Sequence, residues 1–96
     1  MRNNLAHREG ERDFYIGRVA NINPRDRTIL LKNIVTDSGK FTTDHMWFKF
    51  SQDFRRMNLR TGEEIRFRGR IQHYRKKDGL DFGVFCIGQV TRYSYT

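Results

Sequence analysis

Apolar and polar residues alternate along the segment from Glu64 to Tyr74, which predicts a β-strand with two different faces. One face carries Ile65, Phe67, Gly69 and Ile71. The other face carries Arg66, Arg68 and Arg70. Three guanidinium groups in one row repel one another and cannot seal a core, so this face predicts an anionic partner.

A second alternating segment, from about Thr43 to Phe50, predicts another strand. Its apolar face carries Met46, Phe48 and Phe50. Its opposite face carries His45, Trp47 and Lys49. We therefore expect the indole of Trp47 on the outer surface of the sheet rather than in the core.

The rest of the pattern predicts further strands and one short helix. The strands are expected at about residues 14–22, 28–35 and 82–92, and the helix at 51–57. Turn-forming residues separate these elements at 23–26, 37–40 and 76–79. Gly17 is expected to mark a bulge or a sharp bend, Ser51 to cap the helix, and Phe54 to plug the core.

Residues 1–12 are polar and charged without any period, so we expect a flexible N-terminal arm ahead of one domain at 13–93. Three strands, a helix and two strands predict a mainly β fold. The layout is that of a five-stranded Greek-key OB-fold barrel with a short helix between strands 3 and 4. An SH3-like barrel, which lacks this helix, and an open α+β sheet are the alternatives.

The composition adds a strong positive charge. The formal net charge is +8, and charged residues make up 31% of the chain. Eight Phe, four Tyr and one Trp argue for a folded domain, since disordered chains contain few aromatic residues. Most of the basic residues are arginines, which pair with phosphates and stack on bases. Nucleic acid is the partner that this combination predicts; no membrane-binding segment is visible.

Trp47 beside Lys49 predicts a platform on which bases stack. The alternative is a Trp that the N-terminal arm or a partner subunit covers. OB-folds bind ligands across strands 2 and 3 and between the loops that join strands 1–2 and 4–5, here expected at 21–27 and 74–82. The predicted nucleic-acid-binding residues are Arg18, Arg25, Arg27, Lys32, Trp47, Lys49, Arg66, Arg68, Arg70, Tyr74, Arg75, Lys76, Lys77 and Phe82.

For most of these charges there is a plainer interpretation. Isolated cations on a strand are commonly only solvated, and outward arginines also keep a sheet surface soluble. Glu63 and Glu64 would neutralise part of the arginine row. Because the arginine row belongs to the fourth strand, we expect it to act as an electrostatic flank, with Trp47 and the segment from Tyr74 to Lys77 touching the ligand.

Catalytic and metal-binding chemistry finds little support in the sequence. Asp44-His45 is an isolated pair, and no Ser-His-Asp or Cys-His arrangement is suggested. The histidines and the single cysteine, Cys86, lack metal-ligand spacing, so we expect no enzyme activity and no cofactor. Cys86 is expected to be a small core residue. A chain without disulfides and without an N-terminal apolar run fits the reducing cytoplasm.

The segment Thr43-Asp44-His45-Met46-Trp47-Phe48, together with Phe54, Leu59, Gly62-Glu63 and Ile65-Arg66-Phe67, resembles a known family. It is similar to small OB-fold single-stranded-DNA-binding proteins of phages and bacterial mobile genetic elements, including staphylococcal cassettes. The resemblance covers about residues 14–92. It implies binding of single strands without chemistry, in support of replication or transfer of a mobile element. A long acidic C-terminal tail is lacking, so recruitment of repair proteins through such a tail is not expected.

The main hypothesis is therefore a protein that binds single-stranded DNA with little sequence preference. A single-stranded-RNA-binding factor is one alternative, because stacking and positive charge do not distinguish the two sugars. A protein-interaction module with a covered Trp47 is the other. The partners that fit are single-stranded DNA or RNA, a replication helicase or polymerase, and a second copy of the chain.

Overall fold

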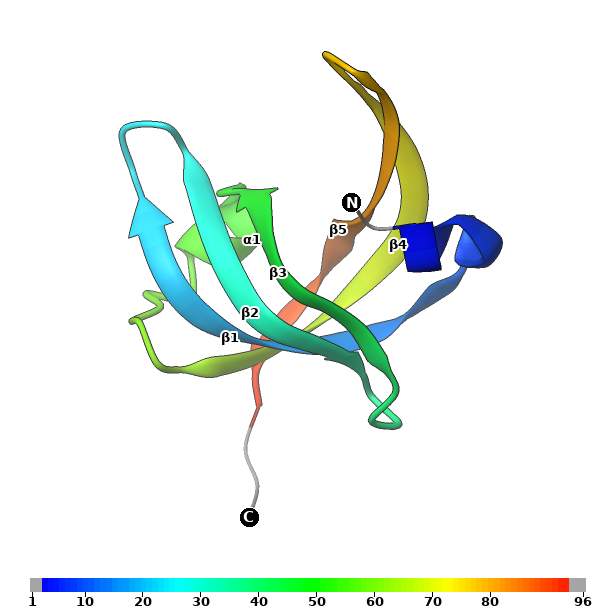
Figure 1. Ribbon diagram of the computed structural model, residues 1–96. Coiled ribbons are helices and arrows are strands. Elements are labelled where there is room, and N and C mark those ends of the chain that lie inside the picture. Colours follow the sequence, from blue (N-terminus) through cyan, green and yellow to red (C-terminus); the bar gives the residue numbers. More distant parts are fainter. Residues whose placement is uncertain (1–2, 94–96) are drawn as a thin grey trace.

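The computed structural model describes residues 3–93 and consists mainly of β-strands (Figure 1). The strands are β1 (Arg12–Asn23), β2 (Thr28–Thr36), β3 (Phe41–Lys49), β4 (Glu64–Lys76) and β5 (Gly79–Arg92). Two short helices accompany them: the 3₁₀ helix η1 (Asn3–Arg8) and the α-helix α1 (Gln52–Arg55). The mainly β class, the number of strands and the helix between the third and fourth strands are confirmed.

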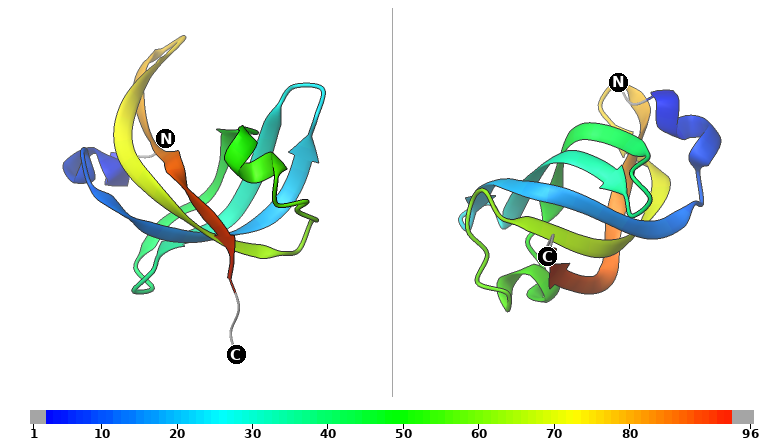
Figure 2. Two further views of the ribbon diagram at one scale, coloured as in Figure 1. Left: turned by 180° about the vertical axis from the view of Figure 1, so that it is seen from behind. Right: turned by 90° about the horizontal axis from the view of Figure 1, so that it is seen from below.

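All five strands form one antiparallel sheet in the order β3-β2-β1-β4-β5. Strand β1 is central and pairs with β4 through its first half and with β2 along most of its length. The register with β2 shifts between Ile16 and Arg18, where Gly17 faces two residues of β2, Asn33 and Ile34. The irregularity expected at Gly17 is therefore present, but the extra residue lies on β2, where Asn33 has a left-handed φ of 54°. The sheet is strongly coiled, so that its two edge strands, β3 and β5, approach each other (Figure 2).

Aromatic rings fill the inside of the coiled sheet. The Phe67 ring is fully buried and lies 5.3 Å from the Phe48 ring, in an edge-to-face arrangement. Tyr15 and Phe54 lie 5.9 and 6.4 Å from Phe67, measured between ring centroids. The apolar faces predicted from alternation are confirmed for Ile65, Phe67, Ile71, Met46 and Phe48, which are all buried. Phe50, expected on the same face as Met46 and Phe48, lies beyond the end of β3 and is only half-buried.

The segment after β3 places Phe54 in the core, as expected, but does so differently from the predicted helix. Helix α1 is a single turn rather than a helix over 51–57. The Ser51 side chain forms no capping hydrogen bond. Instead, its backbone carbonyl accepts hydrogen bonds from the amides of Phe54 and Arg55 at 3.1 and 3.0 Å. Ser51 thus occupies the capping position, as expected, but without a capping hydrogen bond from its side chain.

The N-terminal segment is packed against the sheet rather than free, for the residues from 3 onwards. Leu5 in η1 is fully buried and belongs to the core. The buried guanidinium of Arg8 donates to both carboxylate oxygens of Glu11, at 2.8 and 3.0 Å, and to the Phe41 carbonyl at 3.2 Å. The flexible arm expected at 1–12 is thus wrong for the residues from 3 onwards, which are held by the buried Leu5 and by the ion pair of Arg8 with Glu11. Residues 1–2 lie outside the described part of the chain.

Glu11→Gln should make the stability of the protein less sensitive to acid. Hydrogen bonds from Arg8 hold the pKa of the Glu11 carboxyl below its usual range. A carboxyl with a lowered folded-state pKa stabilises the fold above its unfolded pKa and loses that effect as the pH falls. The wild-type urea midpoint should therefore fall between about pH 5 and pH 3 more steeply than that of the variant. At neutral pH the variant should be about 1–3 kcal/mol less stable. Parallel pH profiles would contradict this role of Glu11.

Candidate nucleic-acid interface

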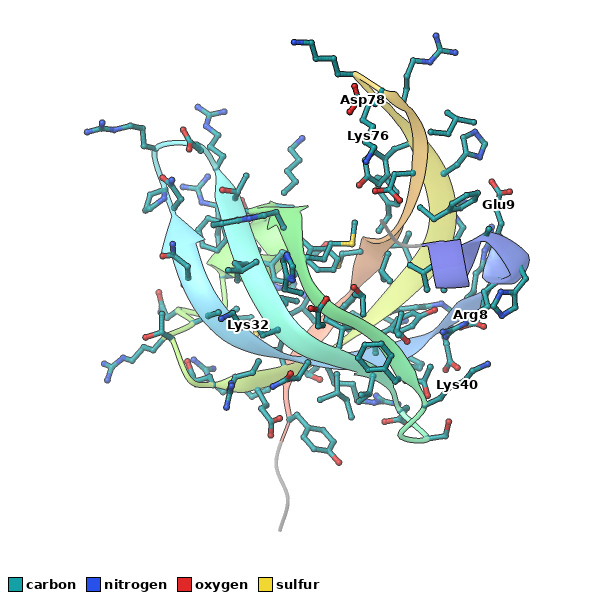
Figure 3. All side chains as sticks on the ribbon, viewed as in Figure 1. Arg8, Glu9, Lys32, Lys40, Lys76 and Asp78 are labelled. Atoms are coloured by element: carbon teal, nitrogen blue, oxygen red, sulfur yellow. The ribbon has the colours of Figure 1, made fainter. Side chains whose placement is uncertain are left out.

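The outer face of β1, β2 and β3 carries a cross-strand row of basic side chains. The ladder pairs Arg18 with Lys32, and Lys32 with His45. All three residues are exposed. Lys32 lies on β2 in the middle of this part of the sheet (Figure 3). The register confirms that Arg18 and Lys32 share a face with Trp47 and Lys49, which follow His45 at alternate positions of β3.

Trp47 lies where this outer face meets a groove along the gap between β3 and β5. The Trp47 side chain is 47% exposed, which is unusual for an indole in a small domain. The groove has a volume of about 330 Å³ and is lined by Met46, Trp47, Tyr74 and Phe85. It continues past Lys49 and Ser51. Aromatic rings from β3, β4 and β5 therefore meet at one open site.

Met46 forms the floor of this groove by bridging the two edge strands. Its thioether sulfur accepts a hydrogen bond from the Val84 amide at 3.2 Å, and so satisfies a buried edge donor of β5. The close approach requires glycine at position 83. A Cβ atom there would lie 2.0 Å from Cε of Met46.

Tyr74 is fixed in the groove by a buried carboxylate. Its hydroxyl donates to Oδ2 of Asp81 at 3.3 Å, and its ring meets the Phe85 ring edge-to-face at 6.2 Å. Asp81 is only 4% exposed. The Lys76 ammonium also donates to Oδ2 of Asp81, at 3.4 Å. Lys76 is therefore partly engaged within the protein, and the Tyr74 ring is held in one orientation at the groove.

Phe82, which was predicted at the interface, does not line the groove, whereas Phe85 does. The ladder pairs Tyr74 with Asp81, so the next residue, Phe82, points to the opposite face of the hairpin. Phe82 instead meets the His73 ring at 6.4 Å. Phe85, which was not expected at the interface, has the parity of Asp81 and lines the groove. Alternation along β5 puts Phe85 on the same face as Asp81. Only the pairing of β5 with β4 shows that this face lines the groove.

The connection between β4 and β5 is a long hairpin rather than a loop over 74–82. The ladder continues to the pair Lys76 and Gly79, which leaves Lys77 and Asp78 at the tip. Arg75 and Lys77 are exposed there. In Figures 1 and 2 this hairpin and the β1–β2 hairpin rise in the same direction, on either side of the end of β3. Arg25 and Arg27 are exposed in the β1–β2 turn.

The arginine row of β4 is partly neutralised by the protein itself. The Arg66 guanidinium donates to both oxygens of Asp37, at 3.0 and 3.3 Å, and lies 3.9 Å from the centre of the Phe14 ring. Arg68 lies 5.7 Å from the same ring. Arg70 stands opposite Phe85 in the ladder, at the groove end of the row. Of the three, Arg70 is thus the one placed nearest to the groove.

The described residues give no sign of a metal centre. Within residues 3–93, no three His, Cys, Asp or Glu side chains gather as a metal ion would require. Cys86 is half-buried beside the groove rather than in the core, and burial raises the pKa of its thiol. In the same part of the chain, no helix is long and apolar enough to cross a membrane.

The interface therefore combines an open aromatic groove with cations on three sides: the outer face of β1 to β3, the β4–β5 tip and the β1–β2 turn. Comparisons with protein-family models, with curated proteins and with solved structures find no match for this chain.

Proposed function

We propose that the chain is an OB-fold barrel that binds single-stranded DNA in the groove between β3 and β5. The strand order, the helix between β3 and β4, and the approach of β3 to β5 are the features of a five-stranded barrel that is partly open between these two strands. An OB-fold binds its ligand beside strands 2 and 3 and between the 1–2 and 4–5 loops. The aromatic groove and its basic surroundings occupy that position.

The observation that carries the proposal is the half-exposed Trp47 in a groove shared with Tyr74 and Phe85. A base has two π-faces, and stacking on an aromatic side chain tolerates any sequence. The cations of the outer face and of the hairpin tip supply the phosphate contacts. The groove opens on one side to solvent, so the splayed bases of a single strand can reach its rings. The bases of a stiff duplex stay paired and stacked and cannot do so. The resemblance of residues 43–67 to proteins of phages and mobile elements supports a role in replication or transfer of such an element.

Binding of oligothymidine should quench the fluorescence of Trp47, the only Trp of the chain. Arg18, Lys32, Lys49, Arg75 and Lys77 together would neutralise phosphates along the path, and these five cations should contribute about −3 to −4 to the slope of log K against log salt. A duplex of the same length serves as the control and should bind more weakly. Matched DNA and RNA oligomers compete in the same assay, and preference for RNA would replace the DNA proposal.

Two results would overturn the proposal. One is the absence of quenching and of binding at low salt. The other is a stable assembly of the free protein, seen by light scattering, in which Trp47 is already inaccessible to a soluble quencher. The second result would favour a protein-interaction module, with a second copy of the chain seated on the groove.

A further inference from the structure

A second concave site lies beyond the groove, between the β1–β2 turn and helix α1. It has a volume of about 330 Å³ and is lined by Pro24, Arg27, Phe50 and Arg55. Two guanidinium groups thus share one small pocket with a half-buried aromatic ring. Only Arg27 among these residues was expected at an interface, because Arg55 lies on a helix predicted to serve the core.

No carboxylate among the described residues compensates the positive charge of this pocket. Arg27 and Arg55 are both exposed, and no carboxylate of residues 3–93 forms an ion pair with either of them. The two nearest acids along the chain have other partners. Asp26 accepts a hydrogen bond from the Asn23 side chain at 3.0 Å, and Asp53 lies 3.7 Å from the Arg56 guanidinium. An anion entering the pocket would meet two available guanidinium forks.

The backbone holds the two sides of the pocket together. The Phe50 amide donates to the Arg27 carbonyl at 2.8 Å, which ties the end of β3 to the β1–β2 turn. Arg27 itself has a left-handed φ of 57°. The turn before it is fixed by Asn23, whose side-chain oxygen accepts a hydrogen bond from the Asp26 amide at 3.1 Å. The pocket is therefore preformed, at a non-glycine residue held in a sparsely populated conformation.

The pocket and the aromatic groove are separated by one stretch of three residues. Lys49 and Ser51 line the groove, and Phe50 between them lines the pocket. The Ser51 amide donates to the Lys49 carbonyl at 2.9 Å, which closes a tight turn at Phe50, and this turn forms a ridge with one site on each side. A chain that leaves the groove past Lys49 reaches Arg27 and Arg55 next.

We infer that the pocket of Arg27, Phe50 and Arg55 binds a phosphate of the same single strand that occupies the groove, and so extends the binding path beyond β3. This inference rests on the proposed function. The two guanidinium groups hold the phosphate oxygens, and the Phe50 ring supplies an apolar contact for the attached sugar or base. The strand then runs from the β4–β5 tip, across Trp47 and over the ridge, to the pocket.

The test compares the salt dependence of oligothymidine binding for two double variants of equal charge. Arg27→Asn/Arg55→Gln removes the pocket cations, and asparagine tolerates the left-handed backbone at 27. Arg56→Gln/Arg60→Gln removes two cations outside the pocket. The pocket variant should reduce the slope of log K against log salt by about 1.4, and weaken binding about tenfold at about 0.1 M salt. The control should change the slope by less than half as much.

The Arg55 side chain is exposed and forms no ion pair with a carboxylate of residues 3–93. Arg55→Gln alone should give about half the effect and guards against misfolding of the double variant. Equal slopes for the pocket variant and the wild type, or equal effects of the pocket and control variants, would overturn the inference and leave the proposed function standing. Absence of binding by the wild-type protein would instead overturn the proposed function itself.

Discussion

Phe67→Ala should lower the free energy of unfolding by about 3–5 kcal/mol. Phe67 is fully buried, and its ring packs against rings of three other segments, those of Tyr15, Phe48 and Phe54. Truncation removes the transfer free energy of the ring and leaves a cavity among rigid neighbours that cannot collapse into it. A domain of this size is stabilised by about 5–15 kcal/mol in total, so the variant should be close to unfolding. Urea titration followed by circular dichroism measures the change.

Phe41→Ala is the matched control for this prediction. Phe41 carries the same side chain at the start of β3, but it is 57% exposed. Its truncation should change the free energy of unfolding by about 0.5 kcal/mol or less. If Phe67→Ala were as mild as Phe41→Ala, the interior of the coiled sheet would not be packed around Phe67.

Alternation along the chain was sufficient to predict β3 and β4 and the faces of these two strands. A shift of one residue would move every apolar side chain of a strand to solvent, so the pattern of Ile65, Phe67 and Ile71 admits one orientation only. The same reasoning placed Trp47 outside and Phe48 inside. The irregularity beside Gly17 was predictable because a glycine inside a strand commonly marks a bulge or a sharp bend, but the pattern did not show that the extra residue would lie on β2.

Features that depend on contacts between distant segments were not predictable. Leu5 is the one large apolar residue of the polar segment η1, and its burial requires a surface that the folded sheet provides, in contact with β4 and β5. Arg66 was expected to be available to a ligand, but Asp37, 29 residues earlier in the chain, occupies its guanidinium. Periodicity describes one segment at a time, so it carries no information about such pairs.

The groove combines one side that the sequence predicts with one side that it does not. Its Trp47 side follows from the parity of β3, whereas its Phe85 side depends on the register between β4 and β5 and on the approach of two edge strands. The long hairpin was missed because an Asp-Gly turn signal gives the position of a reversal but not the length of the ladder that precedes it. The lining of the groove could thus be predicted only in part from the sequence.

Trp47→Ala should weaken the binding of oligothymidine by about 1–3 kcal/mol, which is roughly a 5- to 150-fold increase in Kd. The indole is a large, half-exposed ring of the groove, and it lies at the edge of the outer basic face. Its loss removes one stacking surface, while the cations that hold the phosphates remain. Fluorescence anisotropy of a labelled oligomer measures Kd without the Trp signal. Phe41→Ala, on the same strand, should leave Kd unchanged within about twofold.

The nature of the replacement side chain separates stacking from simple apolar contact. Trp47→Phe keeps a flat π-face and should retain most of the affinity, because stacking depends on the ring plane. Trp47→Leu keeps apolar bulk without a plane and should bind nearly as weakly as Trp47→Ala. Equal affinities for the Phe and Leu variants would show that Trp47 only excludes water from the groove. If Trp47→Ala bound oligothymidine as tightly as Phe41→Ala does, the phosphate contacts alone would account for binding. The DNA strand would then follow the cations and bypass the groove.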